Sequence, residues 1–517
     1  MSRPAVVRAA TGMAGATAIS RLLGFVRVLV VAAVLGTTYL GNTFLAANSV
    51  SNVLFELLAA GALSAVLVPA FVTRLGGDDP AAAERLAGGI LGLALGVLAG
   101  VSLIGMVGAG VLARILTSGA GDPEVVPAQR ALATFLLVFF VPQVLCYAFG
   151  AVATAVLHAR RRFVVTAVAP MANSVVMIVA LGVFAAAVGP EPGLDLDLGA
   201  RLLLVVAGTG GVLAFVGVLV VAVRRTGFRL RPHWGARDPE VRRLVGHSTW
   251  GLLLNASAGA ILGAALVVGN GVAGGVVAYQ VAYVFFLAPY AILAQPISTT
   301  VLPDLADEAE AGDLAAFARS VRWSLGATLR LVVPASVAMV VLARPAMEVV
   351  TFGAAQDGGA ALIAAGVAAL GAGLVPYACF MLLTRACYAL GDSRTPALVA
   401  WAGAFVGIVF MLAAARFVDG EALVAVLGAG HSLAFTASTL VVWVHVARRV
   451  GSGLGPRDLI PVVVSSAVIG VVAWAAFRVV DPVGRPATVA MLGAVGAAGL
   501  LVFVLVFRRV AGTERLA

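Results

Sequence analysis

The stretch Ser20-Arg21-Leu22-Leu23-Gly24-Phe25-Val26-Arg27 decides how this chain folds, because it sets two arginines inside an apolar run from about residue 13 to residue 35. A helix of about 20 apolar residues is long enough to cross a bilayer. A guanidinium at membrane depth costs about 3 kcal/mol even on lenient insertion scales. Each arginine is therefore expected to face a partner or water rather than lipid, and the stretch predicts an internal cationic cavity.

The composition of the whole chain agrees with a membrane protein. Of its 517 residues 62% are hydrophobic and 11% are charged, whereas soluble domains carry about 25% charged residues. The 34 basic residues are all arginines, which excludes a phosphate-binding loop of the kind that needs a lysine. The net charge of +10 lies mostly in alternate short loops, so it indicates membrane topology and no nucleic-acid partner.

Hydropathy predicts an all-α polytopic membrane protein with about fourteen transmembrane helices. The predicted segments are residues 9–35, 42–72, 86–113, 130–157, 164–188, 200–222, 245–270, 276–303, 324–342, 359–388, 396–415, 422–446, 459–477 and 487–507. The bias of arginine toward alternate loops predicts that both termini are cytoplasmic. These loops contain Arg160–Arg162, the seven arginines of 224–243, Arg448, Arg449 and Arg457, and the C-terminal arginines.

An internal repeat relates the two halves of the chain. Leu63–Pro69 resembles Ile297–Pro303, and Val141-Pro142 resembles Val375-Pro376, both at an offset of 234 residues. Each half begins and ends on the same side, which predicts two parallel six-helix lobes, as in parallel-repeat transporters. The predicted organisation is an N-lobe at 1–223, a cytoplasmic connector at 224–243, a C-lobe at 244–449, and two further helices at 450–517.

The first helix is the predicted binding site. Arg21 and Arg27 lie six residues apart, about 120° around a helix, and Gly24 between them thins the helix wall. The planar fork of arginine suits an anionic group such as a pyrophosphate. Pairing of the arginines with helix carbonyls or a carboxylate is the structural alternative.

The second helix carries a polar stripe, Asn48, Asn52 and Glu56, at i, i+4 and i+8 on one face. Such a stripe is expected to line the cavity. Glu56 is a counter-ion for a first-helix arginine, or else a proton or cation site, or simply a structural partner. The residues themselves do not distinguish these roles.

The turn Asp392-Ser393-Arg394-Thr395-Pro396 places a proline at the first position of the next helix, where proline is favoured. We expect Asp392, Arg394 and Pro396, together with Gly24, to serve structure or gating. No His/Asp/Glu grouping has metal or triad spacing, and Cys146, Cys379 and Cys387 form no pair motif. The sequence therefore predicts a protein that is not an enzyme, with no catalytic residues, metal or cofactor.

These residues resemble those of the MurJ (MviN) family of lipid II flippases, within the multidrug/oligosaccharidyl-lipid/polysaccharide exporter superfamily, and the composition suits an actinobacterial branch. The resemblance is carried by four groups of residues: Ser20-Arg21 with Gly24-Phe25 and Arg27; Asn52 with Gly61–Ser64 and Val68-Pro69; His158–Phe163 with Pro170 and Asn173; and Tyr388-Ala389 with Gly391-Asp392 and Arg394–Pro396.

The resemblance implies two lobes around a cationic cavity, alternating access, and transfer of the lipid-linked peptidoglycan precursor from the inner to the outer leaflet of the bacterial cytoplasmic membrane. Helices thirteen and fourteen would hold the polyprenyl tail. The implied partners are a lipid-linked sugar pyrophosphate, membrane lipids, and cell-wall synthesis or division proteins, around a monomer. The chain departs from the family at Asn42, where members often carry aspartate, and lacks their additional arginines in helices two and eight.

Four other functions stay open at this point. A flippase for another polyprenyl-linked glycan has the same anionic headgroup, whereas a drug/cation antiporter of the same superfamily would depend on Glu56. A membrane-embedded glycosyltransferase is disfavoured because no outer loop holds a convincing pair of metal-binding carboxylates. A non-transporting scaffold of the cell-wall machinery is suggested by the lost cavity charges.

Overall fold

The computed structural model describes residues 3–55, 80–189, 192–239, 241, 249–356, 358–451, 460–480 and 482–514, and within these ranges the chain is helical with short connections. The prediction of an all-α membrane protein is confirmed. The described residues include 11 helices long and apolar enough to span a membrane, or 12 if one bent pair is a single span. Of the other predicted segments, 42–72 is described only to Phe55, and 487–507 offers the shorter apolar helix Arg485–Leu501.

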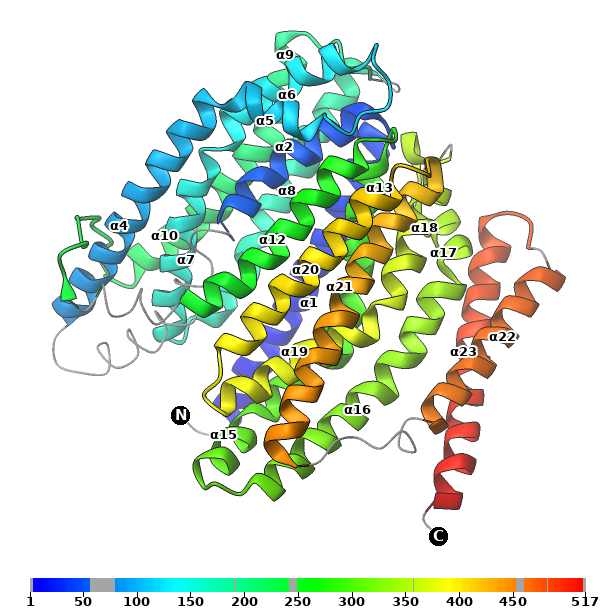
Figure 1. Ribbon diagram of the computed structural model, residues 1–517. Helices are drawn as coiled ribbons and strands as arrows, with labels where there is room; N and C mark the ends of the chain where they lie inside the picture. Colours follow the sequence, from blue (N-terminus) through cyan, green and yellow to red (C-terminus); the bar gives the residue numbers. More distant parts are fainter. Residues whose placement is uncertain are drawn as a thin grey trace. The chain divides into compact units, whose positions relative to one another are not determined.

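The chain forms two compact units, residues 1–276 and 277–517. The helices of the first are α1 (Arg3–Leu35), α2 (Tyr39–Phe55), α4 (Pro80–Val107), α5 (Ala109–Leu116), α6 (Val126–Phe140), α7 (Gln143–Ala159), α8 (Phe163–Val188), α9 (Leu198–Val205), α10 (Gly211–Arg225) and α12 (Thr249–Gly269) (Figure 1). A π-helical turn, Val206–Gly210, joins α9 to α10. The lobe boundaries predicted from sequence stay a prediction.

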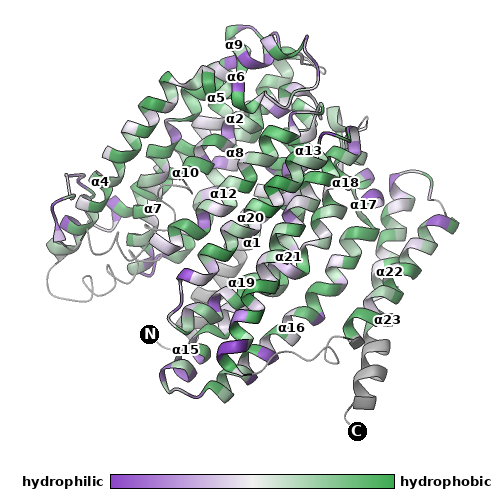
Figure 2. Ribbon diagram, in the orientation of Figure 1, coloured by the Kyte–Doolittle hydropathy of each residue, from purple (hydrophilic) through white to green (hydrophobic). Residues whose placement is uncertain are grey.

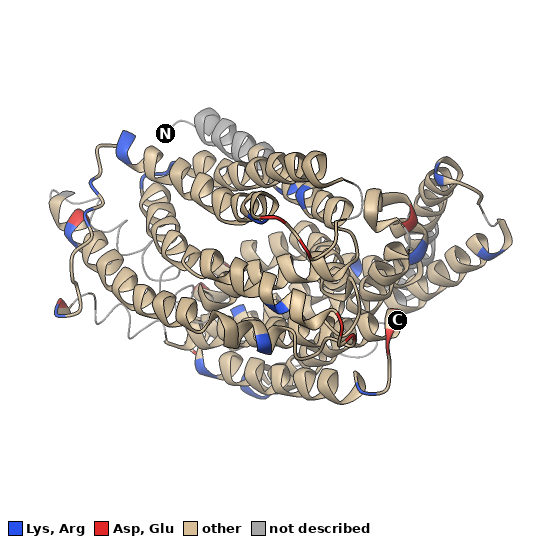
Figure 3. Cartoon of the chain, turned by 90° about the horizontal axis from the view of Figure 1, so that it is seen from above, with Lys and Arg blue, Asp and Glu red and all other residues tan. Residues whose placement is uncertain are grey.

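The second unit begins within α13 (Gly275–Pro289). It continues with α14 (Gln295–Thr300), α15 (Leu302–Glu310), α16 (Leu314–Val341), α17 (Ala343–Val350), α18 (Gly359–Ala372), α19 (Leu374–Ala389), α20 (Arg394–Ala414), α21 (Gly420–Val450), α22 (Ile460–Val480) and α23 (Arg485–Glu514). Apolar residues dominate the helices of both units (Figure 2), and charged residues gather at helix ends and in connections (Figure 3). Side chains on many helix surfaces are therefore apolar, as the interior of a bilayer requires.

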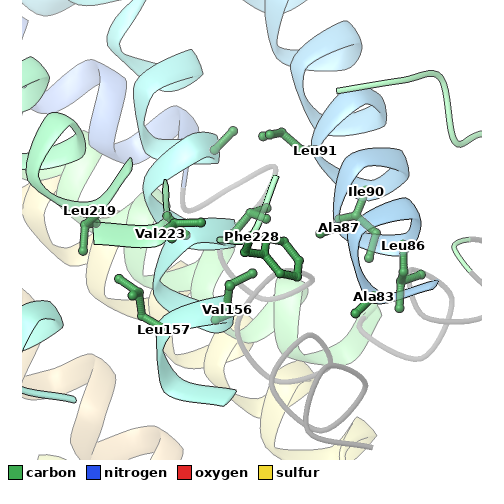
Figure 4. Packing of buried hydrophobic residues seen from close by; sticks show 14 of the residues in the cluster. Ala83, Leu86, Ala87, Ile90, Leu91, Val156, Leu157, Leu219, Val223 and Phe228 are labelled. Atoms are coloured by element: carbon green, nitrogen blue, oxygen red, sulfur yellow. The ribbon is translucent and has the colours of Figure 1, made fainter. Parts of the chain in front are cut away.

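A buried core joins α4, α7 and α10 in the first unit (Figure 4). Leu91 of α4, Val156 of α7 and Leu219 of α10 are fully buried in it, and Phe228, just beyond α10, fills one end. Small residues let the following segment approach α4, since a Cβ on Gly92 would lie 1.9 Å from the carbonyl oxygen of His233. The connector after α10 is thereby held against the helix.

The helices α7 and α19 end in the same way. Arg162 N–H donates to Leu157 O and Arg161 N–H donates to His158 O, and the equivalent bonds at the end of α19 come from Asp392 and Gly391. This is the Schellman arrangement, in which one residue takes the left-handed conformation. Arg161 has φ 56° and Gly391 has φ 75°. The turn that follows α7 and the turn that follows α19 therefore have the same backbone structure.

Candidate functional site

The two arginines of α1 flank open space. Arg21 is exposed and Arg27 is partly buried. A Cβ placed on Gly24, between them, would meet no atom within 4 Å. Residues at i, i+3 and i+6 lie along one side of a helix. Arg21, Gly24 and Arg27 have this spacing, so the two positive charges lie on either side of a position that has no side chain.

Neither guanidinium pairs with a carboxylate in the part of the chain that the structure describes. The partner expected from sequence, Glu56, lies outside the described residues, as does the repeat segment Leu63–Pro69. Cations at membrane depth are stabilised by anions or water rather than by lipid tails. With respect to the described residues, Arg21 and Arg27 are thus available to an anion brought by a ligand.

The polar stripe of α2 divides between two environments. The Oδ1 atom of Asn48 is buried, has no hydrogen-bond partner among the described residues, and would lie 3.0 Å from a Cβ on Gly208 of the π-helical turn. Asn52, one turn later, is exposed. No described contact joins either residue to Arg21 or Arg27, so their role in binding stays a prediction.

A buried hydrogen-bond network crosses the first unit beside this stripe. Ser51 Oγ donates to Gln143 Oε1 over 3.0 Å, and Gln143 Nε2 donates to Thr209 Oγ1 over 2.9 Å. Ser51 and Gln143 are fully buried. The network ties α2 and α7 to the π-helical turn, and such turns often occur at functional sites. Sequence analysis missed it, although a glutamine directly after Pro142 in an apolar segment was the available signal.

A second network holds the loop between α12 and α13 against α2. The side chain of Asn42, fully buried, donates from Nδ2 to Val272 O over 2.8 Å and accepts at Oδ1 from Val276 N–H over 3.0 Å. Gln129 of α6 donates to Asn270 Oδ1 over 2.9 Å, and Asn270 donates to Leu116 O over 2.8 Å. We call these residues the amide clasp. The amide clasp joins loops that the predicted topology places on the outer side of the membrane.

The turn before α20 forms an ionic cluster in the second unit. Asp392 accepts from Thr395 N–H over 2.9 Å and lies 2.9 Å from His445 Nε2 and 3.6 Å from Arg449 Nη2, both on α21. Partial burial alone would raise the pKa of Asp392, but the hydrogen bonds from Thr395 and His445 and the charge of Arg449 together lower it. Pro396 is the third residue of α20 rather than the first, still within the turn that tolerates proline.

The last two helices enclose an apolar groove of about 580 Å³. It is lined by aliphatic side chains of α22 and α23, with Val472 and Ala476 on one side and Ala490, Ala494 and Ala498 on the other. None of the described residues that line it is charged. The groove can accept a hydrocarbon chain and offers nothing to a polar headgroup.

The described residues contain no group of three or more His, Cys, Asp or Glu side chains that could hold a metal ion. The three cysteines are free thiols. The described part of the candidate site consists of arginines, amides and apolar surfaces.

Comparison with known proteins gives one consistent family. The model of the family described as lipid II flippase MurJ matches residues 31–493. A probable lipid II flippase MurJ of Rhizobium tropici is 28% identical over 393 residues, covering 74% of this chain and 70% of that protein. One from Synechocystis sp. is 25% identical over 465 residues, covering 89% and 85%.

Solved structures agree on the fold. The structure titled lipid II flippase MurJ, inward closed conformation, superposes with a TM-score of 0.76 at 16% identity, covering 97% of this chain and 98% of that chain. An inward-facing multidrug resistance MATE family transporter of the MOP superfamily gives 0.67 at 12% identity, covering 84% and 94%. The expected exporter fold is confirmed.

Proposed function

Because the chain belongs to the lipid II flippase MurJ family, we propose that it carries lipid II from the inner to the outer leaflet of the cytoplasmic membrane, in support of cell-wall synthesis. It is a multi-pass membrane transporter and not an enzyme. Lipid II joins a polyprenyl chain to a sugar and peptide headgroup through a pyrophosphate. The substrate thus has one anionic, one polar and one long apolar part, and each needs its own surface.

The observation that carries this proposal is the pair of arginines in α1. Arg21 and Arg27 have no carboxylate partner among the described residues and border the open space beside Gly24. Two guanidinium forks match the oxygens of a pyrophosphate, where each good charged hydrogen bond contributes about 1.5–3 kcal/mol. In this role Arg21 and Arg27 hold the pyrophosphate and the exposed side chain of Asn52 faces the sugars, while the parts of Asn48 and Glu56 in binding stay predictions from the sequence.

The amide clasp supplies an outer closure for alternating access. Its side chains, Asn42, Gln129 and Asn270, hold connections that the arginine bias assigns to the outer side, with both termini in the cytoplasm. Such a clasp has to open when substrate leaves toward the outer leaflet. Neutral amide bonds suit this, because each contributes only about 1 kcal/mol net.

The groove between α22 and α23 has the apolar character required for the polyprenyl tail. Burial of a CH₂ group contributes about 0.8 kcal/mol when water is the alternative, but a tail in a bilayer is already in hydrocarbon. The groove therefore guides the polyprenyl chain during transfer more than it increases the affinity for the substrate. The headgroup can then cross the membrane while the tail stays in contact with an apolar surface.

The test is complementation of a bacterium depleted of its own lipid II flippase, scored as lipid II in the outer leaflet at matched membrane levels of protein. The wild-type chain is expected to restore growth and outer-leaflet lipid II, and Arg21→Ala and Arg27→Ala to lose both. Arg416→Ala, at an exposed arginine outside α1, is the control and should behave as wild type.

The same experiment separates the competing functions. Full rescue by Arg21→Ala and Arg27→Ala would contradict the role of the arginines and favour a scaffold. Failure of the inserted wild-type chain to expose lipid II would contradict lipid II as the substrate. A flippase for another polyprenyl-linked glycan would then be identified by the lipid-linked sugar that accumulates in the inner leaflet when this protein is removed from the bacterium that makes it.

A further inference from the structure

A second groove, of about 630 Å³, lies on the first unit where α7, α8 and α10 meet. Its walls are apolar and come from Leu157, Val165, Val218, Val221 and Ala222. Val218 and Val221 are 37% and 48% exposed, while Leu157 is buried and continues into the core shown in Figure 4. The inner wall of the groove is thus formed by a buried core residue, and its outer side is exposed.

Gly217 gives the groove its depth. It lines the groove from α10, and a Cβ at this position would meet no atom within 4 Å. Glycine inside a helix is less favourable than alanine. Here its missing side chain leaves room along the helix that a hydrocarbon chain can occupy.

Two arginines close one end of the groove. Arg162 follows α7 and Arg225 ends α10, and both line the groove and are exposed. Neither forms an ion pair within the described ranges of the chain. Two positive charges at the end of an apolar groove match an anionic headgroup attached to acyl chains.

The turns that carry these arginines are fixed to each other. Arg160 Nη1 donates to Thr226 O over 2.7 Å, and its guanidinium lies 5.5 Å from the centre of the Phe228 ring. Arg161 holds the left-handed position of the turn although glycine occupies the counterpart position, Gly391. The end of α7 is thereby joined to the end of α10, and Arg162 and Arg225 stay at the end of the same groove.

We propose that this groove is a binding site for an anionic phospholipid of the leaflet next to the arginine-rich loops. One acyl chain lies along Gly217, Val218 and Val221, and the phosphate is held by Arg162 and Arg225. Basic pockets between transmembrane helices bind anionic headgroups in this way. The described lining of the groove between α22 and α23 carries no charge, so of these two grooves the one at α7, α8 and α10 is where charge selects the lipid.

The experiment measures binding of phosphatidylglycerol and phosphatidylcholine with the same acyl chains to the purified full chain, by native mass spectrometry and by lipid-dependent shifts in melting temperature. Wild type is expected to bind phosphatidylglycerol in preference. An arginine near the headgroup contributes about 1 kcal/mol, so Arg225→Gln should weaken binding about fivefold and Arg162→Gln/Arg225→Gln about 25-fold.

Matched variants test the two parts of the site separately. Arg224→Gln removes a charge from the same helix end but outside the groove, and Gly182→Leu adds a side chain at another exposed glycine with open space; both should bind as wild type. Gly217→Leu should fill the groove and lose the lipid without unfolding. Soluble glycerol phosphate should not compete, since it lacks acyl chains.

Three outcomes would overturn the proposal. One is equal binding of the two lipids by wild type, and another is unchanged binding by the double arginine variant. The third is retention of phosphatidylglycerol by Gly217→Leu, which would place the lipid outside the groove. None of these readouts depends on lipid II, so they are independent of the result for transport.

Discussion

Asn42 and Val276 lie 234 residues apart in the chain and are joined by a hydrogen bond in which Val276 N–H donates to Asn42 Oδ1 over 3.0 Å. The same offset relates Pro142 to Pro376 in the internal repeat. A residue of the first half therefore contacts its own repeat equivalent. The hydrogen bond joins the first turn of α2 to the start of α13.

Replacement of Asn42 by alanine should open this clasp. The change leaves Val276 N–H and Val272 O without their partner, and a buried group left unsatisfied costs about 1–3 kcal/mol. A reporter cysteine at Thr37, beside Gly274 in the clasp, should react faster with a membrane-impermeant maleimide in Asn42→Ala. Asn255→Ala is the control, because the exposed side chain of Asn255 donates to Gly251 O of its own helix turn. Equal labelling rates in all three proteins would argue against a gating role for the clasp.

Gly24→Leu should block transport without unfolding the protein. The new side chain enters open space between Arg21 and Arg27, and leucine favours a helix over glycine by about 1 kcal/mol. We expect at least a tenfold loss of outer-leaflet lipid II with an unchanged melting temperature. Gly100→Leu, in α4, also meets open space and should transport normally. Normal transport by Gly24→Leu would mean that substrate does not pass this face of α1.

The fold was predictable from the sequence to a greater extent than the site was. Apolar runs of about 20 residues mark membrane spans whatever their tertiary contacts, so most of the predicted spans are confirmed in the described part of the chain. The pair Arg21 and Arg27 was predictable for the same reason, because charge in an apolar run stands out. Asn42, Gln129 and Gln143 gave a weaker signal, even though Gln143 directly follows Pro142 in an apolar segment, since a single neutral amide is common in helices and its importance depends on a partner far away in the chain.

Asp392 should stabilise the second unit in a pH-dependent way. Its pKa is lowered in the folded state by Thr395, His445 and Arg449 against the opposing effect of burial. A lowered carboxyl pKa gives stability that is present above the unfolded value of about 4 and is lost as the pH falls through the folded value. Asp392→Asn keeps an oxygen that can accept from Thr395 N–H but removes the negative charge that faces His445 and Arg449, so it should lower stability at pH 7 by about 0.5 kcal/mol.

Thermal unfolding of the two proteins between pH 3 and pH 8 checks this prediction. The difference in melting temperature should be constant above pH 5 and should shrink below pH 4, where wild type loses the carboxylate as well. Asp419→Asn is the matched control, since Asp419 is exposed and makes no side-chain cap at α21. A difference that persists unchanged to pH 3 would show that the carboxylate charge is not what stabilises the turn.

Ala494→Phe should separate the roles of tail and headgroup. Ala494 lines the groove of α22 and α23, and a phenyl ring there occupies space that the polyprenyl chain requires. Outer-leaflet lipid II should fall, while binding of a soluble pyrophosphate analogue that lacks the tail should not change, because the arginines of α1 are untouched. Ala497→Phe places the same ring on an exposed position of α23 outside the groove, so it should transport as wild type. If both phenylalanine variants lose transport equally, the effect comes from α23 in general and the groove does not guide the tail.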